Sequence, residues 1–393
     1  MKILLFSSLF PSSVRPVHGI FVETRLRELL QSGGVQATVV APVPWFPSRA
    51  PCFGEYARFA ATPAFERRNG MDVYHPRYAL LPKVGMRMAP YAMALGAFPV
   101  LKKLQQQGFD FDLIDAHYYY PDGVAAGLLA RWLGKPFFVT ARGTDINLIA
   151  EFARPRKHML ATARAAAGSV AVSQALADRL VALGAPAQRV HCLRNGVDTR
   201  RFAPQPRDVA RRRLGLAEEG RYWLMVGNLV ELKGHAVAIE ALAAVPEVQL
   251  LCAGSGPERT RLEAFAQRLG VADRVHFAGQ VPQTDLPWWY SAADALVLCS
   301  SREGWPNVLL ESMACGTPVL ATRVGGTPEI VDAPAAGQML EQRDAQALME
   351  AWQRLTADLP ARAATRQYAE GFSWASTTQG QRQLFEQVVH GQS

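Results

Sequence analysis

The chain has 393 residues, and its hydrophobic content of 49% is high enough to exclude a mostly disordered protein. Its five cysteines show neither C-x-x-C pairing nor zinc-site spacing, which favours a reducing compartment over a disulfide scaffold. The net charge of +8 is uneven, because residues 1–200 hold 24 basic and 13 acidic side chains whereas residues 201–393 hold 18 and 21. This length predicts two domains of about 100–200 residues each, one basic and one mildly acidic.

The first half alternates short apolar runs with helical stretches, the pattern of a parallel sheet covered by helices. Its longest apolar run, 88–101, contains Pro90 and Pro99 and is too short to cross a bilayer. The predicted elements, in chain order, are a strand at 3–6, a helix at 22–30, strands at 37–40 and 113–116, a helix at 123–133, and strands at 137–140 and 169–172.

After a proline-containing stretch predicted as a linker at 199–208, the same pattern begins again. We expect domains at 1–198 and 209–373, with a C-terminal helix at about 374–393 that packs back on the first domain. Two doubly wound α/β units place their ligand sites at the carboxyl ends of the strands. The predicted elements of this half are strands at 223–226, 249–252, 275–277, 295–299 and 318–321, and helices at 235–244, 259–269, 306–315 and 374–390.

The segment after strand 295–299 has the densest cluster of polar groups. Pro306 suits the start of a helix and Gly316 its end. The first turn of that helix leaves the N–H groups of Asn307 and Val308 without helical partners, which makes an anion site for a phosphate.

Two glutamates flank this anion site. Glu303, followed by Gly304, precedes the helix and could accept hydrogen bonds from sugar hydroxyls. Glu311 lies about 7.5 Å into the helix, at 1.5 Å per residue, where it could bind a ribose diol. The arrangement predicts a nucleotide-sugar pocket; a capping acid and a surface glutamate are the plainer alternative.

Further strand–loop–helix junctions carry glycine. In 226–235, Lys233 is placed to neutralise a diphosphate, while Gly227 and Gly234 permit close backbone approach. Near the amino terminus, Gly19 ends a long loop and opens a helix whose N–H groups could face the same diphosphate.

Read together, these segments resemble glycosyltransferase family 4, the retaining glycosyl transferases group 1, which have the GT-B fold of two facing Rossmann-like domains. The match is dense over 190–335 and looser over 1–190. The residues that carry it are Glu303 and Glu311 with seven residues between them, Gly227, Lys233 and Gly234, Gly254-Ser255-Gly256-Pro257, Asn195-Gly196-Val197-Asp198, Gly325–Ile330 and Phe372-Ser373-Trp374.

The resemblance implies a hexosyltransferase that moves a sugar from a UDP- or GDP-sugar, with retention of configuration and without metal or other cofactor. It implies a donor bound by the second domain and a glycan or lipid-diphosphate-linked acceptor bound by the first, in cell-surface or exported polysaccharide biosynthesis. It also implies that backbone around Gly279 and Val281 contacts the nucleobase.

Two departures from the family pattern stand out. Asn228 occupies a position where the family commonly has arginine, and Arg142 occupies one where it commonly has histidine. We expect Arg142 to supply positive charge to the donor site, partly offsetting Asn228. His117, at the end of strand 113–116, is a further candidate for a catalytic or acceptor-orienting histidine.

Two other functions remain open. A nucleotide-sugar epimerase can use the same fold, and the two departures would also suit a catalytically inactive sugar-nucleotide-binding subunit. A dehydrogenase is disfavoured, because Gly254-Ser255-Gly256 lacks the full G-x-G-x-x-G spacing.

The excess positive charge lies in the expected acceptor domain, not in the donor domain. We expect a cytoplasmic protein, and 80–107 is a candidate for contact with an anionic membrane at the inner face of the plasma membrane. A core helix with solvated ends is the alternative. Scattered basic residues without a recognition motif exclude nucleic acid as the expected partner. The basic residues of this segment are Lys83, Arg87, Lys102 and Lys103.

Overall fold

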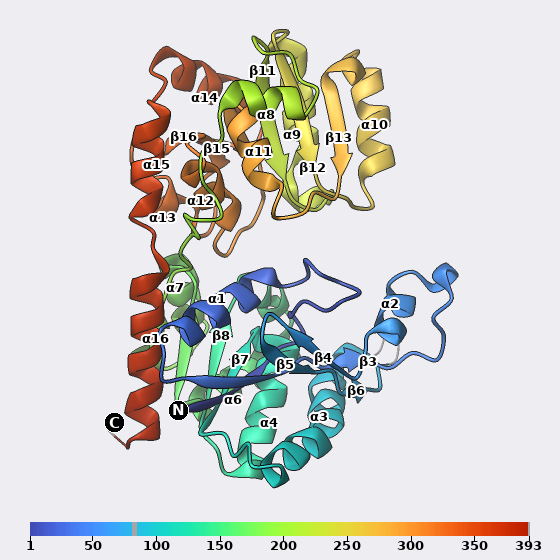
Figure 1. Cartoon of the computed structure of the whole chain (residues 1–393), viewed down its shortest axis with the longest axis vertical. Helices are drawn as coiled ribbons and strands as arrows, with labels where there is room; N and C mark the ends of the chain where they lie inside the picture. The colour runs from blue at the N-terminus through green and yellow to red at the C-terminus, as the bar shows by residue number, and fades with distance from the viewer. Residues whose placement is uncertain (81–84, 392–393) are drawn as a thin grey trace. The chain divides into compact units, whose positions relative to one another are not determined.

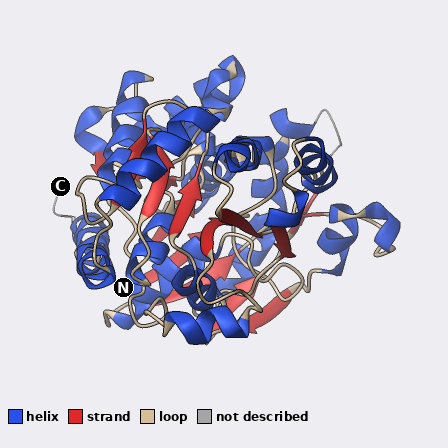
Figure 2. Ribbon diagram, turned by 90° about the horizontal axis from the view of Figure 1, so that it is seen from above, coloured by secondary structure: helices blue, strands red, loops and turns tan. Residues whose placement is uncertain are grey.

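The computed structural model describes residues 1–80 and 85–391. The chain forms two compact units, the first of residues 1–194 with 375–393 and the second of residues 195–374. Both are α/β, with parallel strands between helices (Figures 1 and 2). The predicted fold class of two Rossmann-like domains with a C-terminal helix is confirmed.

The first unit contains a sheet in the order β10-β9-β8-β7-β1-β2-β5-β4, in which only β4 runs antiparallel to its neighbour. Strands β1, β7 and β8 are almost entirely buried, as expected for a parallel sheet that is covered on both faces. The strand bounds are β1 Lys2–Phe6, β2 Gln36–Val40, β4 Phe65–Arg68, β5 Met71–Tyr74, β7 Leu113–His117, β8 Phe137–Ala141, β9 Gly168–Ala171 and β10 Val190–Cys192, with β3 Val43–Pro44 paired to β6 Arg77–Tyr78.

Helices cover both faces of this sheet, with α1 and α16 on one face and α3 and α4 on the other (Figure 1). Leu29 of α1 and Phe385 of α16 share one core cluster with strand residues, and the rings of Phe138 and Phe385 are 4.9 Å apart. The helices are α1 Ile20–Gln31, α2 Glu55–Ala61, α3 Ala89–Gln106, α4 Val124–Leu133, α5 Thr144–Asn147, α6 Ala153–Ala165, α7 Gln174–Ala182 and α16 Trp374–Val389.

The second unit contains an all-parallel sheet in the order β13-β12-β11-β14-β15-β16. Trp223 and Trp352 pack edge to face in its main core cluster, with ring centroids 5.6 Å apart. The strands are β11 Arg221–Val226, β12 Val248–Ala253, β13 Val275–Gly279, β14 Ala295–Leu298, β15 Val319–Thr322 and β16 Gly337–Leu340. The helices are α8 Arg207–Arg213, α9 His235–Ala241, α10 Arg259–Arg268, α11 Leu286–Ala292, α12 Asn307–Ala314, α13 Thr327–Ile330, α14 Ala345–Ala357 and α15 Arg362–Glu370.

Residues 199–208 do not form the linker predicted from their prolines. The boundary between the units lies between residues 194 and 195, and the later stretch packs on the second unit. Phe202 is buried, Arg366 donates a hydrogen bond to the carbonyl oxygen of Thr199 at 3.0 Å, and the N–H of Gln205 donates to Ser291 Oγ at 3.0 Å. The prolines interrupt regular secondary structure, but the contacts above still hold this irregular segment on the second unit.

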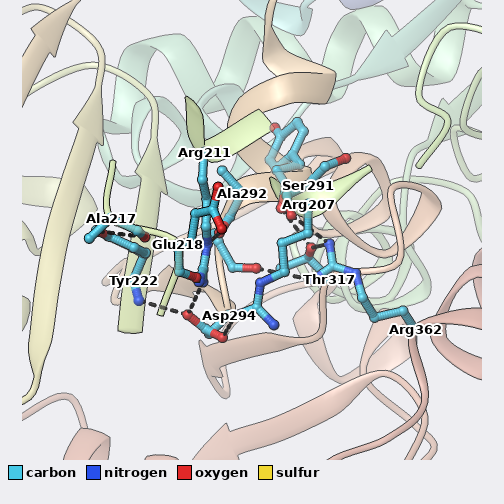
Figure 3. A network of polar contacts seen from close by, with 12 residues as sticks. Arg207, Arg211, Ala217, Glu218, Tyr222, Ser291, Ala292, Asp294, Thr317 and Arg362 are labelled. Carbon is cyan, nitrogen blue, oxygen red and sulfur yellow. Dashed lines mark hydrogen bonds and ion pairs between the residues drawn. The ribbon is translucent and has the colours of Figure 1, made fainter. Parts of the chain in front are cut away.

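Asp294 directly precedes β14 and connects several elements at the amino ends of the strands in the second unit (Figure 3). Its carboxylate contacts Arg207, accepts from Arg211 Nη2 at 3.0 Å and accepts from the backbone N–H of Tyr222 at 2.8 Å. These contacts hold α8 against the start of β11, at the end of the sheet opposite the carboxyl ends of its strands.

In the part of the chain that the structure describes, we find no helix both long and apolar enough to cross a membrane.

Candidate active site

Loops at the carboxyl ends of β11, β12 and β14 pack tightly against one another in the second unit. The N–H of Ser301 donates to the carbonyl oxygen of Leu232 at 2.9 Å. Gly254 and Gly234 permit this approach, since a Cβ would lie 1.7 Å from the carbonyl oxygen of Gly227 at the first position and 2.1 Å from that of Cys299 at the second. The predicted glycine loops therefore form one connected layer.

Lys233 and Glu303 meet in this layer. Lys233 Nζ lies 2.7 Å from Glu303 Oε1, and both side chains are only partly exposed. The residue expected to bind a diphosphate and the residue expected to bind a sugar are thus paired with each other.

The backbone of Glu303 is supported by the loop after β15. Gly325 has a φ of 52°, and a Cβ there would lie 1.9 Å from the carbonyl oxygen of Glu303. The N–H of Gly326 donates to the carbonyl oxygen of Gly304 at 3.2 Å. Any larger side chain at residue 325 would displace Glu303.

Helix α12 starts one residue later than predicted, with Pro306 at the N-cap position. Asn307 and Val308 therefore lie in its first turn, where backbone N–H groups have no acceptor one turn earlier. Asn195 supports this turn by donating from Nδ2 to Asn307 Oδ1 at 3.3 Å, and its carbonyl oxygen accepts from Trp305 Nε1 at 3.0 Å. Asn195 is one of the residues that carry the family resemblance, and the contact of its side chain with Asn307 gives a reason for an asparagine at this position.

Glu311 lies on α12 and accepts a hydrogen bond from the Tyr290 hydroxyl at 2.8 Å. Burial raises the pKa of Glu311 to about 7. Its carboxyl group is therefore divided between the protonated and ionised forms near neutral pH.

The remaining predicted binding residues of this unit lie at the same strand ends. Asn228 follows β11 and is exposed, and its carbonyl oxygen accepts from the N–H of Val230 at 2.9 Å. Gly279 ends β13 with a φ of 72°, and Val281 follows it. Contact of this segment with a nucleobase stays a prediction.

In the first unit, Gly19 is the N-cap residue of α1 with a φ of 68°. A Cβ there would lie 2.2 Å from the carbonyl oxygen of Leu9, so the loop after β1 folds closely over this position. The same loop is held at Ser8, whose Oγ donates to Asp122 Oδ2 at 3.0 Å. These contacts therefore hold the start of α1 in place within the first unit.

Arg142 and His117 contact each other at the ends of β8 and β7, through Nη2 and Nδ1 respectively. The His117 ring is 1% exposed, and its Nε2 lies 3.1 Å from Asp115 Oδ2. Burial lowers the pKa of His117 to about 4 and that of Arg142 to about 9. A ring so enclosed does not suit the expected substrate-facing role of His117, whereas Arg142 keeps some exposure and lies over the Phe21 ring, 5.1 Å from its centroid.

Asp145, Asp115 and Gln381 were not among the predicted site residues. Asp145 accepts from the backbone N–H groups of Tyr119, Arg142 and Gly143 and so shapes the turn that carries Arg142. The two-residue spacing of Asp115 and His117 on one strand was a sequence signal for the contact between their side chains. No sequence signal pointed to Gln381.

Family models match nearly the whole chain. The model of glycosyl transferases group 1 matches residues 206–372, and that of glycosyltransferase family 4 matches residues 22–201. The chain is 32% identical over 359 residues to the Bacillus subtilis (strain 168) protein named as the teichuronic acid biosynthesis glycosyltransferase TuaC, covering 89% of this chain and 88% of TuaC.

The chain belongs to the family 4 glycosyltransferases.

One further relative supports this family membership, and two solved structures share the fold. A D-inositol 3-phosphate glycosyltransferase of Catenulispora acidiphila is 31% identical over 72% of this chain and 73% of its own length. Sucrose-phosphate synthase from Thermosynechococcus elongatus shares the fold with a TM-score of 0.81 and 22% identity over 99% of both chains. Anabaena HepE in complex with UDP gives a TM-score of 0.73 and 22% identity over 98% of this chain and 99% of HepE.

Across residues 1–80 and 85–391, we find no group of three or more His, Cys, Asp or Glu side chains arranged to hold a metal ion.

Proposed function

We propose that this glycosyltransferase is a retaining hexosyltransferase, which moves a sugar from a nucleotide-sugar donor to a glycan or lipid-diphosphate-linked acceptor in cell-surface polysaccharide biosynthesis. The observation that carries the proposal is the Lys233–Glu303 pair beside the first turn of α12. Complexes of HepE with UDP and with UDP-glucose support a nucleotide-sugar donor. The name of TuaC supports an acceptor from polysaccharide biosynthesis.

The second unit would bind the donor. Lys233 leaves Glu303 for the diphosphate, which also accepts hydrogen bonds from the N–H groups of Asn307 and Val308. Glu303 then accepts from sugar hydroxyls, and ionised Glu311 accepts from the ribose diol. Backbone at Gly279 and Val281 would contact a uracil or guanine base.

The transfer step needs no metal or further cofactor in this proposal. The bond from the anomeric carbon to the diphosphate oxygen breaks, and a bond to the acceptor oxygen forms on the same face of the sugar. The acceptor proton passes to the departing diphosphate. Lys233 and the helix N–H groups stabilise the charge that develops there.

The first unit would bind the acceptor, and its Arg142 would present positive charge to an anionic substrate group. A specific observation also favours peripheral binding to an anionic membrane at the inner face of the plasma membrane. Tyr91 and Leu95 are exposed on α3, as is its N-cap residue Met88, and Lys102 lies near the other end of the same helix. Of the predicted basic residues of this face, Lys83 lies outside the described residues.

A thermal-shift screen of UDP-, GDP- and ADP-sugars tests the donor, because binding to the folded state raises the melting temperature. NMR of the best ligand with the enzyme then separates the alternatives. Slow hydrolysis, or transfer to a lipid-linked acceptor, supports a transferase, whereas isomerisation of the nucleotide sugar supports an epimerase. Binding without turnover on any acceptor supports an inactive subunit.

A further inference from the structure

A buried chain of hydrogen bonds connects the C-terminal helix α16 with Arg142 in the first unit. Arg25 Nε donates to Gln381 Oε1 at 2.7 Å, and Gln381 Nε2 donates to Asp115 Oδ2 at 2.9 Å. His117 Nε2 lies 3.1 Å from the same carboxylate oxygen, and His117 Nδ1 contacts Arg142 Nη2. The side chains between the two arginines are at most 2% exposed.

Each hydrogen bond in this chain can run in only one direction. Arginine carries only donors, so Gln381 turns its carbonyl oxygen to Arg25 and its NH₂ group to Asp115. A carboxylate only accepts, so His117 carries its proton on Nε2. The lone pair on Nδ1 then accepts a hydrogen bond from Arg142, and this bond fixes the position of the guanidinium group.

The members of the chain come from four elements that are far apart in sequence. Arg25 lies on α1, Asp115 and His117 on β7, Arg142 after β8, and Gln381 on α16. Helix α16 belongs to the first unit although the whole second unit precedes it in the chain. The Gln381 side chain of this helix is buried in the first unit, where it contacts Asp115, a residue 266 positions earlier in the chain.

We propose that Gln381 is a positioning residue for Arg142, acting through the positions of Asp115 and His117. His117 is likewise a positioning residue and not a proton donor or acceptor for substrate, because both ring nitrogens are engaged. The inference rests on the proposed function only in giving Arg142 an anionic substrate group to meet. The hydrogen-bond chain itself can be tested without any substrate.

The first test is nitrogen NMR of the full chain labelled with ¹⁵N-histidine, with His117→Gln used to assign the His117 signals. The wild type should show a protonated Nε2 and an unprotonated Nδ1 at neutral pH. In Gln381→Met, Asp115 loses the Gln381 hydrogen bond but still accepts from His117 Nε2, so the tautomer should persist while the His117 signals shift with the displaced carboxylate. Gln383→Met changes an exposed glutamine on the same helix and should leave them unchanged.

A wild-type Nδ1 that carries the proton, or a His117 spectrum unaffected by Gln381→Met, would overturn the proposal. If Gln381→Met does not fold, Asp115→Asn tests the same chain, because a neutral amide oxygen accepts from His117 Nε2 more weakly than a carboxylate does. Arg142 still donates to Nδ1, so that variant should keep the proton on Nε2 but shift the His117 signals; signals identical to those of the wild type would contradict the proposal.

The second test uses UDP-glucose, GDP-mannose and ADP-glucose as donors. With a donor that the wild type turns over, Gln381→Met should lower kcat about tenfold or more, because a displaced charge loses its alignment. The donor KM and the unfolding midpoint should change little, and Gln383→Met should match the wild type. Normal kcat in Gln381→Met would overturn the proposal. If no donor binds the wild type, the proposed function fails, while the NMR result still decides the role of Gln381.

Discussion

Lys233 Nζ lies 2.7 Å from Glu303 Oε1, so two side chains expected to contact different parts of one donor are paired with each other. The pair holds both charges at the carboxyl edge of the sheet. Since each side chain retains some exposure, the pair should stabilise the fold by no more than about 1 kcal/mol.

Replacing Lys233 with methionine should therefore weaken donor binding far more than folding. A hydrogen bond to a charged group contributes about 1.5–3 kcal/mol, so the donor Kd should rise about 10- to 100-fold in titration calorimetry. The unfolding free energy should change by less than about 1 kcal/mol. Lys157→Met, at an exposed lysine of the first unit, is the control. Equal donor affinity in both variants would remove Lys233 from the donor site.

Donor binding should strengthen between pH 6 and pH 8, because only ionised Glu311 can accept from both ribose hydroxyls. With a pKa of about 7, the binding-competent fraction rises across this interval, and the donor Kd should fall about tenfold. Glu311→Gln should bind more weakly and lose this dependence. A wild-type profile that coincides with that of Glu311→Gln would contradict the role of Glu311.

The carboxyl group of Glu311 should also make the stability of the fold depend on pH, in the opposite direction from donor binding. Its pKa in the folded chain lies above the ordinary value of 4.5, so the folded chain binds more protons between pH 4.5 and pH 7. The contribution of Glu311 to the free energy of unfolding should therefore fall as pH rises through this interval. Urea unfolding of wild type and Glu311→Gln at several pH values measures the difference, and a difference that rises with pH would be inconsistent with the raised pKa.

Alanine at Gly325 should impair catalysis by moving Glu303. The added Cβ would lie 1.9 Å from the Glu303 carbonyl oxygen, and misplacement of a site residue by about 1 Å can lower kcat about 100-fold. Gly270→Ala is a matched control, since Gly270 also has a positive φ of 68° but no atom within 4 Å of an added Cβ. It should lose only about 1–2 kcal/mol of stability and keep its kcat. Similar kcat values for the two variants would show that Gly325 does not position Glu303.

The positions of most buried strands along the chain, and the glycine loops at their ends, could be predicted from local signals, because buried parallel strands are short apolar runs that often end in glycine. The short or amphipathic elements β4, β5, β10 and β16 gave no such signal. The contact of Lys233 with Glu303 joins residues 70 positions apart, and that of Gln381 with Asp115 joins residues 266 apart. Such pairs depend on helix packing and side-chain rotamers, which neither composition nor spacing specifies.

The Asp294 network should be structural and not catalytic (Figure 3). Asp294→Asn removes the charge that compensates the buried Arg211, so unfolding by urea should show a loss of about 3 kcal/mol. Asp285→Asn, where an exposed aspartate lies 3.6 Å from Arg213, should lose less than about 1 kcal/mol. A small effect at Asp294 would mean that water compensates Arg211 equally well.

The exposed face of α3 should bind vesicles that contain phosphatidylglycerol, and added salt should weaken the binding. Leu95→Asp removes an apolar contact and adds a repelled charge, so co-sedimentation should fall about tenfold, as expected for loss of one buried leucine. Leu359→Asp, at an exposed leucine of the second unit, should bind like the wild type. Absence of binding at low salt would reject the membrane proposal and leave the transferase proposal intact.

The central claim is that this family 4 glycosyltransferase breaks the bond between a sugar and a nucleoside diphosphate with retention. Proton NMR of the first sugar released from, or transferred by, the tightest-binding nucleotide sugar tests it most directly. We expect that sugar to keep the anomeric configuration of the donor, with the rate strongly reduced in Glu303→Gln. A first product of inverted configuration, or a nucleotide sugar that is only isomerised, would contradict the account.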